Sequence, residues 1–181
     1  MARRAPQPHR VRARPPPPAL LRRTDELGPV LTDDRNLSQL CYAHLAGQAL
    51  GWRWRPSGEL LRRAQAAQRR IATQTSVSAL HKSVFGALRE MGWAPQLEAL
   101  TADGCLSIDI ALPAAEGRAG IAVEVDGPSH FTSTGAKTAN TRLRDFLLGQ
   151  LGWRVVALPY FELDEASASG RLPEYLAARL R

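Results

Sequence analysis

The chain has 181 residues, of which 44% are hydrophobic and 23% charged, and its formal net charge is +7. This length suits one globular domain with extensions, because domains commonly span ~100–200 residues. No stretch approaches the ~20 unbroken apolar residues that span a bilayer, so a transmembrane protein is excluded. Cys41 and Cys105 lack the paired Cys or His spacings of a zinc finger or a disulfide scaffold.

The first 23 residues carry the whole net charge. They hold seven arginines and no acid, whereas the rest of the chain has 17 basic and 17 acidic residues. Because such a segment cannot bury enough apolar surface to fold alone, we expect residues 1–31 to be a disordered Arg/Pro-rich leader. Three interpretations stay open: an arm that binds RNA through Arg10, Arg12 and Arg14, an organelle-targeting peptide, or a linker from a longer protein.

Residues 32–75 are predicted to form a helical extension of two helices. Apolar residues recur at helical spacing over residues 37–50, and a glycine follows them. The second helix begins near Ser57 and is locally basic, with Arg69 and Arg70 near its end. These arginines are interpreted either as a solvated helix surface or as an RNA-contacting stripe.

The next elements are predicted to be a helix followed by three strands. The helix is amphipathic and ends at Gly92. Asp103 and Gly104 predict a two-residue hairpin turn. Alternating apolar residues predict strands over residues 106–112 and 121–126.

A further helix and strand complete the predicted order α-β-β-β-α-β. The helix spans roughly residues 138–151, and its expected inward side chains are Leu143, Phe146, Leu147 and Leu151. Residues 153–162 are largely apolar, which predicts a strand in the interior of the sheet. A closing helix is expected in the sequence LPEYLAARL.

Three acids lie opposite the apolar residues of their strands, namely Asp109, Glu124 and Asp126. If the two strands are neighbours, the three carboxylates converge on one face of the sheet. Clustered carboxylates repel one another unless a cation, a hydrogen-bond network or solvent compensates them. One interpretation is therefore a Mg²⁺ site, since this ion prefers oxygen ligands. The other is an ordinary polar face that alternation turns outward.

The string EVDGPSHF, residues 124–131, ends a strand in a Gly-Pro turn that presents Ser129, His130 and Phe131 at the sheet edge. Together with GWRVVALPYFE, it makes residues 121–181 resemble the RAP domain, an RNA-binding domain abundant in apicomplexans. The upstream sequences SALHKSVFGALREMGW and SIDIALP resemble the stretch that precedes RAP domains in octotricopeptide-like organellar proteins.

The resemblance implies an α/β (α+β) protein whose core, residues 76–181, has a restriction-endonuclease-like fold. It also implies a mitochondrial or chloroplast protein that binds RNA and acts in transcript or rRNA processing, stability or translation. The ribosome and other organellar RNA-processing proteins are further expected partners. The residues expected to contact RNA are Arg10, Arg12, Arg14, Arg69, Arg70, Ser129, His130, Phe131, Lys137 and Arg142.

A metal-dependent nuclease is the alternative that the resemblance raises. In nucleases of this fold, an Asp on one strand and an (Asp/Glu)-x-Lys motif on the next hold the metal. Asp109 and Glu124 match the two acids, but Asp126 stands where the lysine belongs. Lys137 or His130 would have to substitute, His130 as a general base. We therefore expect RNA binding without a cofactor; an Mg²⁺-dependent nuclease and a structural ribosome-associated protein stay open.

Overall fold

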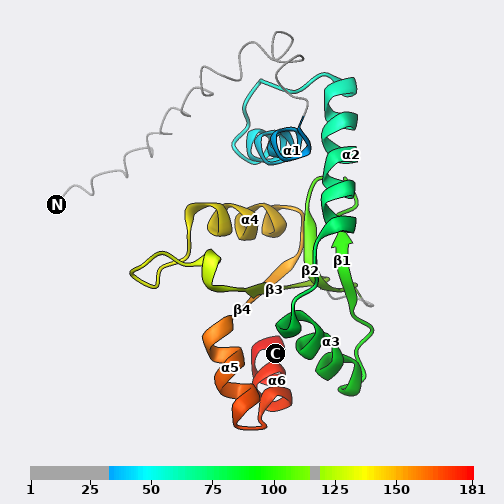
Figure 1. The fold of residues 1–181 in the computed structure, drawn as a ribbon. Helices are drawn as coiled ribbons and strands as arrows, with labels where there is room; N and C mark the ends of the chain where they lie inside the picture. Colours follow the sequence, from blue (N-terminus) through cyan, green and yellow to red (C-terminus); the bar gives the residue numbers. More distant parts are fainter. Residues whose placement is uncertain (1–32, 115–118) are drawn as a thin grey trace, which may run out of the picture.

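The computed structural model describes residues 33–114 and 119–181, so the predicted leader lies outside the described residues. The described part of the chain forms six α-helices and one four-stranded mixed sheet (Figure 1), which confirms the mixed α+β class. No helix in this part is long and apolar enough to cross a membrane. The helices are α1 (Asp34–Ala49), α2 (Gly58–Gln74), α3 (Ala79–Glu90), α4 (Ala139–Gln150), α5 (Tyr160–Ala168) and α6 (Leu172–Leu180).

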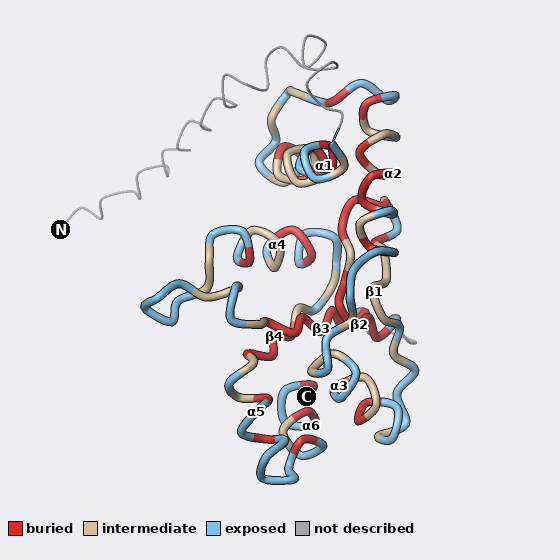
Figure 2. Tube along the Cα trace, viewed as in Figure 1, coloured by how far each residue is buried: buried red, intermediate tan, exposed pale blue. Residues whose placement is uncertain are grey.

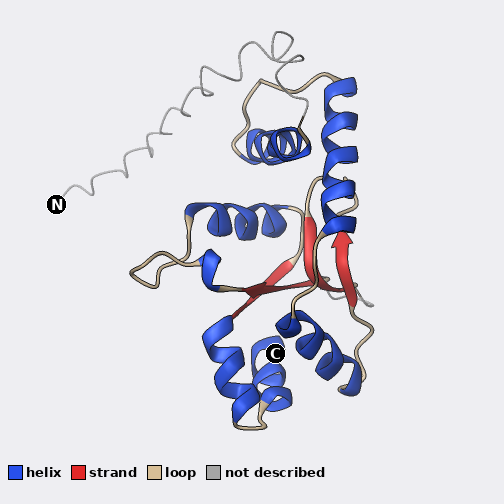
Figure 3. Cartoon of the chain, in the orientation of Figure 1, coloured by secondary structure: helices blue, strands red, loops and turns tan. Residues whose placement is uncertain are grey.

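The sheet follows the predicted element order, with its strands side by side as β1-β2-β3-β4 (Figure 3). β1 pairs with β2 and β2 with β3 in antiparallel fashion, while α4 provides the crossover that makes β4 parallel to β3. The strands are β1 (Gln96–Leu100), β2 (Ser107–Leu112), β3 (Ile121–Asp126) and β4 (Arg154–Pro159).

The connection between β1 and β2 is longer than the predicted two-residue turn. The last paired residues of this ladder are Leu100 and Ser107, so the loop spans residues 101–106. Asp103 organises it, because its Oδ1 accepts hydrogen bonds from the Thr101 hydroxyl at 2.6 Å and from the Cys105 amide at 3.0 Å. The side chain of Asp103 thus stabilises a wider loop than the Asp-Gly pattern predicts.

The expectations that β4 lies inside the sheet and that it extends over residues 153–162 are both wrong. β4 is an edge strand that ends at Pro159, and α5 begins at Tyr160. Proline has no N–H to continue a ladder, and its fixed φ suits the entry to a helix. The apolar character of β4 reflects the helices on both faces of the sheet (Figure 2). Val156 and Leu158 are buried in one hydrophobic cluster, and Val155 packs against the other.

The inward face of α4 also differs from the prediction. Leu147 and Leu148 are fully buried and Leu143 is partly buried, whereas Phe146 is 45% exposed and Leu151 36% exposed. The face that packs on the sheet also includes Arg144, one helical turn before Leu147 and Leu148. Leu143 and Leu147 therefore lie inward as predicted, whereas Phe146 and Leu151 do not, because Arg144 and Leu148 occupy this face.

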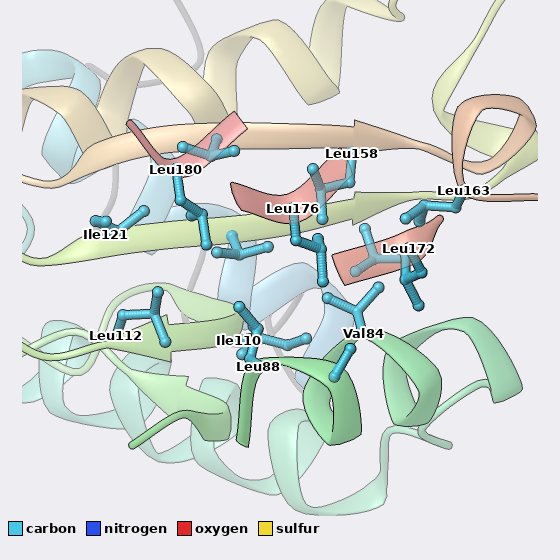
Figure 4. Packing of buried hydrophobic residues seen from close by; sticks show 14 of the residues in the cluster. Val84, Leu88, Ile110, Leu112, Ile121, Leu158, Leu163, Leu172, Leu176 and Leu180 are labelled. Carbon is cyan, nitrogen blue, oxygen red and sulfur yellow. The ribbon is translucent and has the colours of Figure 1, made fainter. Parts of the chain in front are cut away.

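Helices cover both faces of the sheet, each over its own hydrophobic cluster. On one face α3, α5 and α6 pack through residues such as Leu88, Leu163 and Leu176 (Figure 4). On the other face the predicted helical extension, α1 and α2, shares a cluster with α4 and with Ile108 and Ala122 of the sheet. The extension therefore completes the second layer of the core.

Candidate functional site

The three predicted carboxylates lie on neighbouring strands and are buried beneath α4. Asp109 is 8% exposed, Glu124 2% and Asp126 1%. Glu124 Oε1 accepts a hydrogen bond from the Asp109 amide at 3.4 Å, and Asp109 Oδ2 accepts one from the Val125 amide at 2.9 Å. The structure thus brings Asp109 and Glu124 into direct proximity.

Arg144, from the inward face of α4, forms ion pairs with both of these acids. Its Nη2 donates to Asp109 Oδ1 at 2.7 Å and lies 2.5 Å from Glu124 Oε2. It also donates to the backbone oxygen of Ser107 at 3.2 Å. The sequence patterns did not predict this residue. Its place one turn before Leu147 and Leu148 was the only available signal, because these two buried leucines define the inward face.

The two carboxylates that share one guanidinium have opposite pKa shifts. Burial alone raises the pKa of Asp109, but His81, Arg144 and the Val125 amide outweigh it and lower this pKa well below the usual range. Burial raises the pKa of Glu124 well above its usual value; Arg144 opposes this shift and the negative charge of Asp109 adds to it. Of the two acids, Glu124 is therefore the one that binds a proton more readily.

Asp126 belongs to a second ion-pair group, formed with the loop that follows β3. Lys137 Nζ lies 2.8 Å from Asp126 Oδ2 and 2.7 Å from Asp145 Oδ2. Burial lowers the pKa of Lys137, but the Asp126 and Asp145 carboxylates outweigh it and raise the pKa. His130 Nδ1 lies 3.3 Å from Asp126 Oδ1 and 3.2 Å from the Thr141 hydroxyl. The loop that follows β3 therefore supplies the cation that the strand lacks.

An aromatic cluster lies where β3 and β4 end. The ring centroid of Phe131 is 6.1 Å from that of Tyr160 and 5.6 Å from that of Phe161, and those of Tyr160 and Phe161 are 5.4 Å apart. Phe161 is 50% exposed. Tyr160 and Phe161 were not predicted as site residues, because the apolar run over residues 153–162 indicated a strand. The helix start at Tyr160 instead turns them toward Phe131.

The predicted RNA-contacting residues divide into separate regions. Ser129, His130, Phe131, Lys137 and Arg142 lie on the segment from the end of β3 to the start of α4, where Arg142 Nη1 donates to the Lys137 carbonyl at 2.5 Å.

Arg69 and Arg70 lie on α2, which is on the opposite side of α4 from the loop after β3 (Figure 1). Arg70 forms a paired hydrogen bond with Asp34 of α1, at 2.8 and 2.6 Å. The leader residues Arg10, Arg12 and Arg14 lie outside the described part of the chain.

The three carboxylates do not fit the predicted Mg²⁺ site in this arrangement. Arg144 holds Asp109 Oδ1 and Glu124 Oε2, and Lys137 and His130 hold the two oxygens of Asp126. A Mg²⁺ ion takes near-octahedral oxygen ligands, so these three side chains would first have to move. As arranged, the site is a charge-compensated network.

One protein family matches this part of the chain. Residues 123–176, which run from β3 into α6, match the family model of the RAP domain. The match includes the loop after β3, Arg144 of α4 and the aromatic cluster. No curated protein matches the chain.

Proposed function

Because the chain carries a RAP domain, a domain generally associated with RNA binding, we propose that the protein binds RNA in a mitochondrion or chloroplast. It would act there in transcript or rRNA processing, stability or translation, together with the ribosome or other RNA-processing proteins. The family match to residues 123–176 is the observation that carries this proposal.

The edge formed by Phe131, Tyr160 and Phe161 supports single-stranded RNA as the ligand. Nucleobases stack on aromatic rings without regard to sequence, and Phe161 offers half of its surface to solvent. His130 and the exposed Arg142 lie on the same segment as Phe131. A cavity of about 180 Å³ beside them is lined by Gln39, Tyr42, His130, Asn140, Thr141, Leu143 and Arg144. Its polar groups suit hydrogen bonding to base edges.

The test compares exposed rings at two places. Phe131→Ala and Phe161→Ala should each weaken the binding of a single-stranded RNA oligonucleotide by about tenfold, since a stacked base contributes ~1–3 kcal/mol. Phe146→Ala is the matched control, because Phe146 is 45% exposed on α4 and lies outside the aromatic cluster. Fluorescence anisotropy measures the affinities. Equal affinities for all three variants and wild type would place RNA binding elsewhere.

Deletion of residues 1–23 tests the basic arm. The arginines of this leader should bind phosphates, so the deletion should weaken RNA binding nearly equally for all sequences. It should also lower the slope of log K against log salt by ~0.7 for each lost contact. An unchanged slope would favour a targeting leader, which import experiments would reveal as a precursor cleaved within these residues.

A metal-dependent nuclease is the second candidate, and the position of Lys137 favours it. This lysine reaches Asp126 from the next loop, at 2.8 Å, where the strand motif lacks its own lysine. The discriminating variant is Glu124→Gln, which removes a ligand charge at nearly constant volume. A nuclease would lose Mg²⁺-dependent RNA cleavage in this variant and in Asp109→Asn, whereas a binding protein would show no such cleavage even as wild type.

A further inference from the structure

A second group of ligand-type side chains lies on the far side of Asp109 from Arg144. His81 of α3, Glu98 of β1 and Asp109 of β2 each offer one ligand atom, and these atoms all lie within 4.8 Å of one another. Pairing of Leu97 with Ile110 and of Ala99 with Ile108 sets Glu98 beside Asp109. Three elements thus supply one imidazole and two carboxylates to a single point.

The spacing of His81 and Asp109 resembles that of two metal ligands. His81 Nε2 lies 3.4 Å from Asp109 Oδ2, which is long for a hydrogen bond. Two atoms bound to one tetrahedral Zn²⁺ at ~2.1 Å are separated by roughly the same distance. Asp109 Oδ2 accepts one hydrogen bond, from Val125, and keeps a second lone pair.

His81 is held in the orientation that a ligand requires. Its Nδ1 lies 2.6 Å from the hydroxyl of Ser78, the residue that caps α3. Because Nδ1 faces this hydroxyl, Nε2 is directed toward Asp109. An outer hydrogen bond of this kind is what usually orients metal-binding histidines.

Glu98 has a strained backbone and a carboxylate that forms no ion pair with any described residue. Its φ of +46° is the only positive value at a non-glycine position among the described residues, and such strain concentrates at functional sites. No hydrogen bond or ion pair joins its carboxylate to another described residue. Burial, with the negative charge of Asp109, raises the pKa of Glu98. A cation between the two acids would remove this repulsion.

We propose that His81, Glu98 and Asp109 bind one divalent transition-metal ion of the Zn²⁺ class. One nitrogen and two oxygen ligands suit Zn²⁺, whereas Mg²⁺ prefers oxygen ligands alone. Arg144 contacts Asp109 and Glu124 and acts on Glu98 only through space, so three carboxylates share one guanidinium and the surroundings carry an excess of negative charge. The bound ion would join α3 to the β1–β2 hairpin.

The experiment titrates the full-length, tag-free chain with Zn²⁺ and, separately, with Mg²⁺. We expect one Zn²⁺ per chain by calorimetry and by elemental analysis after dialysis, a Tm that rises with Zn²⁺ concentration, and no comparable effect of Mg²⁺. Co²⁺ as a spectroscopic substitute should give no thiolate charge-transfer band, which excludes Cys41 and Cys105 as ligands. A chain that retains no Zn²⁺, or a thiolate band, overturns the proposal.

Variants locate the ion. His81→Gln and Glu98→Gln should each reduce Zn²⁺ affinity by well over tenfold, because outer-shell changes alone cost ~10–100-fold. Ser78→Thr keeps a hydroxyl for the imidazole and should retain binding. The matched controls are His44→Gln on α1 and Glu90→Gln, an exposed acid at the end of α3. Circular dichroism without metal confirms folding. Unchanged affinity in a folded His81→Gln or Glu98→Gln variant overturns the proposal.

Discussion

The two faces of the sheet are built differently. All the buried polar residues of the described chain lie on the α1–α2–α4 side or in the adjoining strands and loop: Ser38, Gln68, Thr101, Asp109, Glu124, Asp126 and Thr141. The α3–α5–α6 layer contributes none of them, and its core consists of aliphatic side chains such as Leu88 and Leu176 (Figure 4).

This difference indicates that the aliphatic face mainly stabilises the fold, whereas the charged face has a chemical role. An aliphatic cluster stabilises the fold at any pH, because nothing in it titrates. Buried carboxylates lose hydration, and one guanidinium only partly compensates two of them. A fold needs no such arrangement for stability, so the charged face is the side on which a function is expected.

The largest effect is expected from removal of the shared cation. Arg144→Ala should lower the free energy of unfolding by about 3–5 kcal/mol, because it removes the guanidinium that two buried carboxylates share. Urea denaturation measures it, with Arg142→Ala as control, an exposed arginine on the same helix that loses only its hydrogen bond to the Lys137 carbonyl and should cost about 0.5–1.5 kcal/mol. If both variants lower the free energy of unfolding by the same amount, the carboxylates are solvated and the contrast between the two faces is overestimated.

A combined replacement sharpens the same contrast. Asp109→Asn, Glu124→Gln and Arg144→Met together leave no unpaired charge, so most of the stability lost in Arg144→Ala should return. Equal losses in the single and the triple variant would show that shape, rather than charge, governs this face.

The aliphatic face should respond to the loss of volume alone. Leu176 is fully buried, and Leu176→Ala should lower the free energy of unfolding by about 2–5 kcal/mol through the cavity that it leaves. Leu50→Ala, at a side chain that is 41% exposed, should cost about 0.5 kcal/mol or less. The Leu176→Ala loss should be the same from pH 5 to pH 8; a loss that varies with pH would contradict the assignment of titrating groups to the other face.

The charged face should make stability depend on pH through Glu124. Its folded-state pKa is raised, so the native state binds more protons than the unfolded state above an unfolded pKa of ~4.3. This contribution to stability is complete below that pH and is lost as pH rises through the folded pKa. The Glu124→Gln variant should therefore lack this decline, which denaturation at several pH values would show.

The control for this titration is Glu90→Gln, a change at an exposed acid that should retain the wild-type pH dependence. Asp109 should not contribute in the same window, since its pKa is lowered and its stabilising effect is lost only in strong acid. A wild-type advantage over Glu124→Gln that grows with pH would mean that Arg144 outweighs burial at Glu124.

The sequence predicted a part of each face, and the reason is physical. Alternation in β2 and β3 was sufficient to place Asp109 and Glu124 together, because a strand has only two faces. Arg144 was not predicted because a charged helical residue is normally exposed, and only the tertiary contacts show that its side chain is mostly covered. The start of α5 was not predicted for a similar reason. Residues 153–162 are apolar in either a strand or a helix, and only the end of the strand at Pro159 shows where the helix begins.

The smallest effect concerns a polar contact at the edge of the aliphatic face. The Tyr175 hydroxyl donates to Glu162 Oε2 at 2.7 Å, joining α6 to α5. Tyr175→Phe should cost about 0.5–1.5 kcal/mol, the usual net contribution of one hydrogen bond. Burial first, and Glu162 second, raise the pKa of Tyr175, so this contribution should be present below pH ~10 and be lost as pH rises further.

Tyr42→Phe on α1 is the control, since its hydroxyl has no hydrogen bond within the described residues. If Tyr42→Phe lowers the free energy of unfolding as much as Tyr175→Phe does, the loss of a hydroxyl group alone explains the effect. The contact with Glu162 would then not stabilise the packing of α5 against α6.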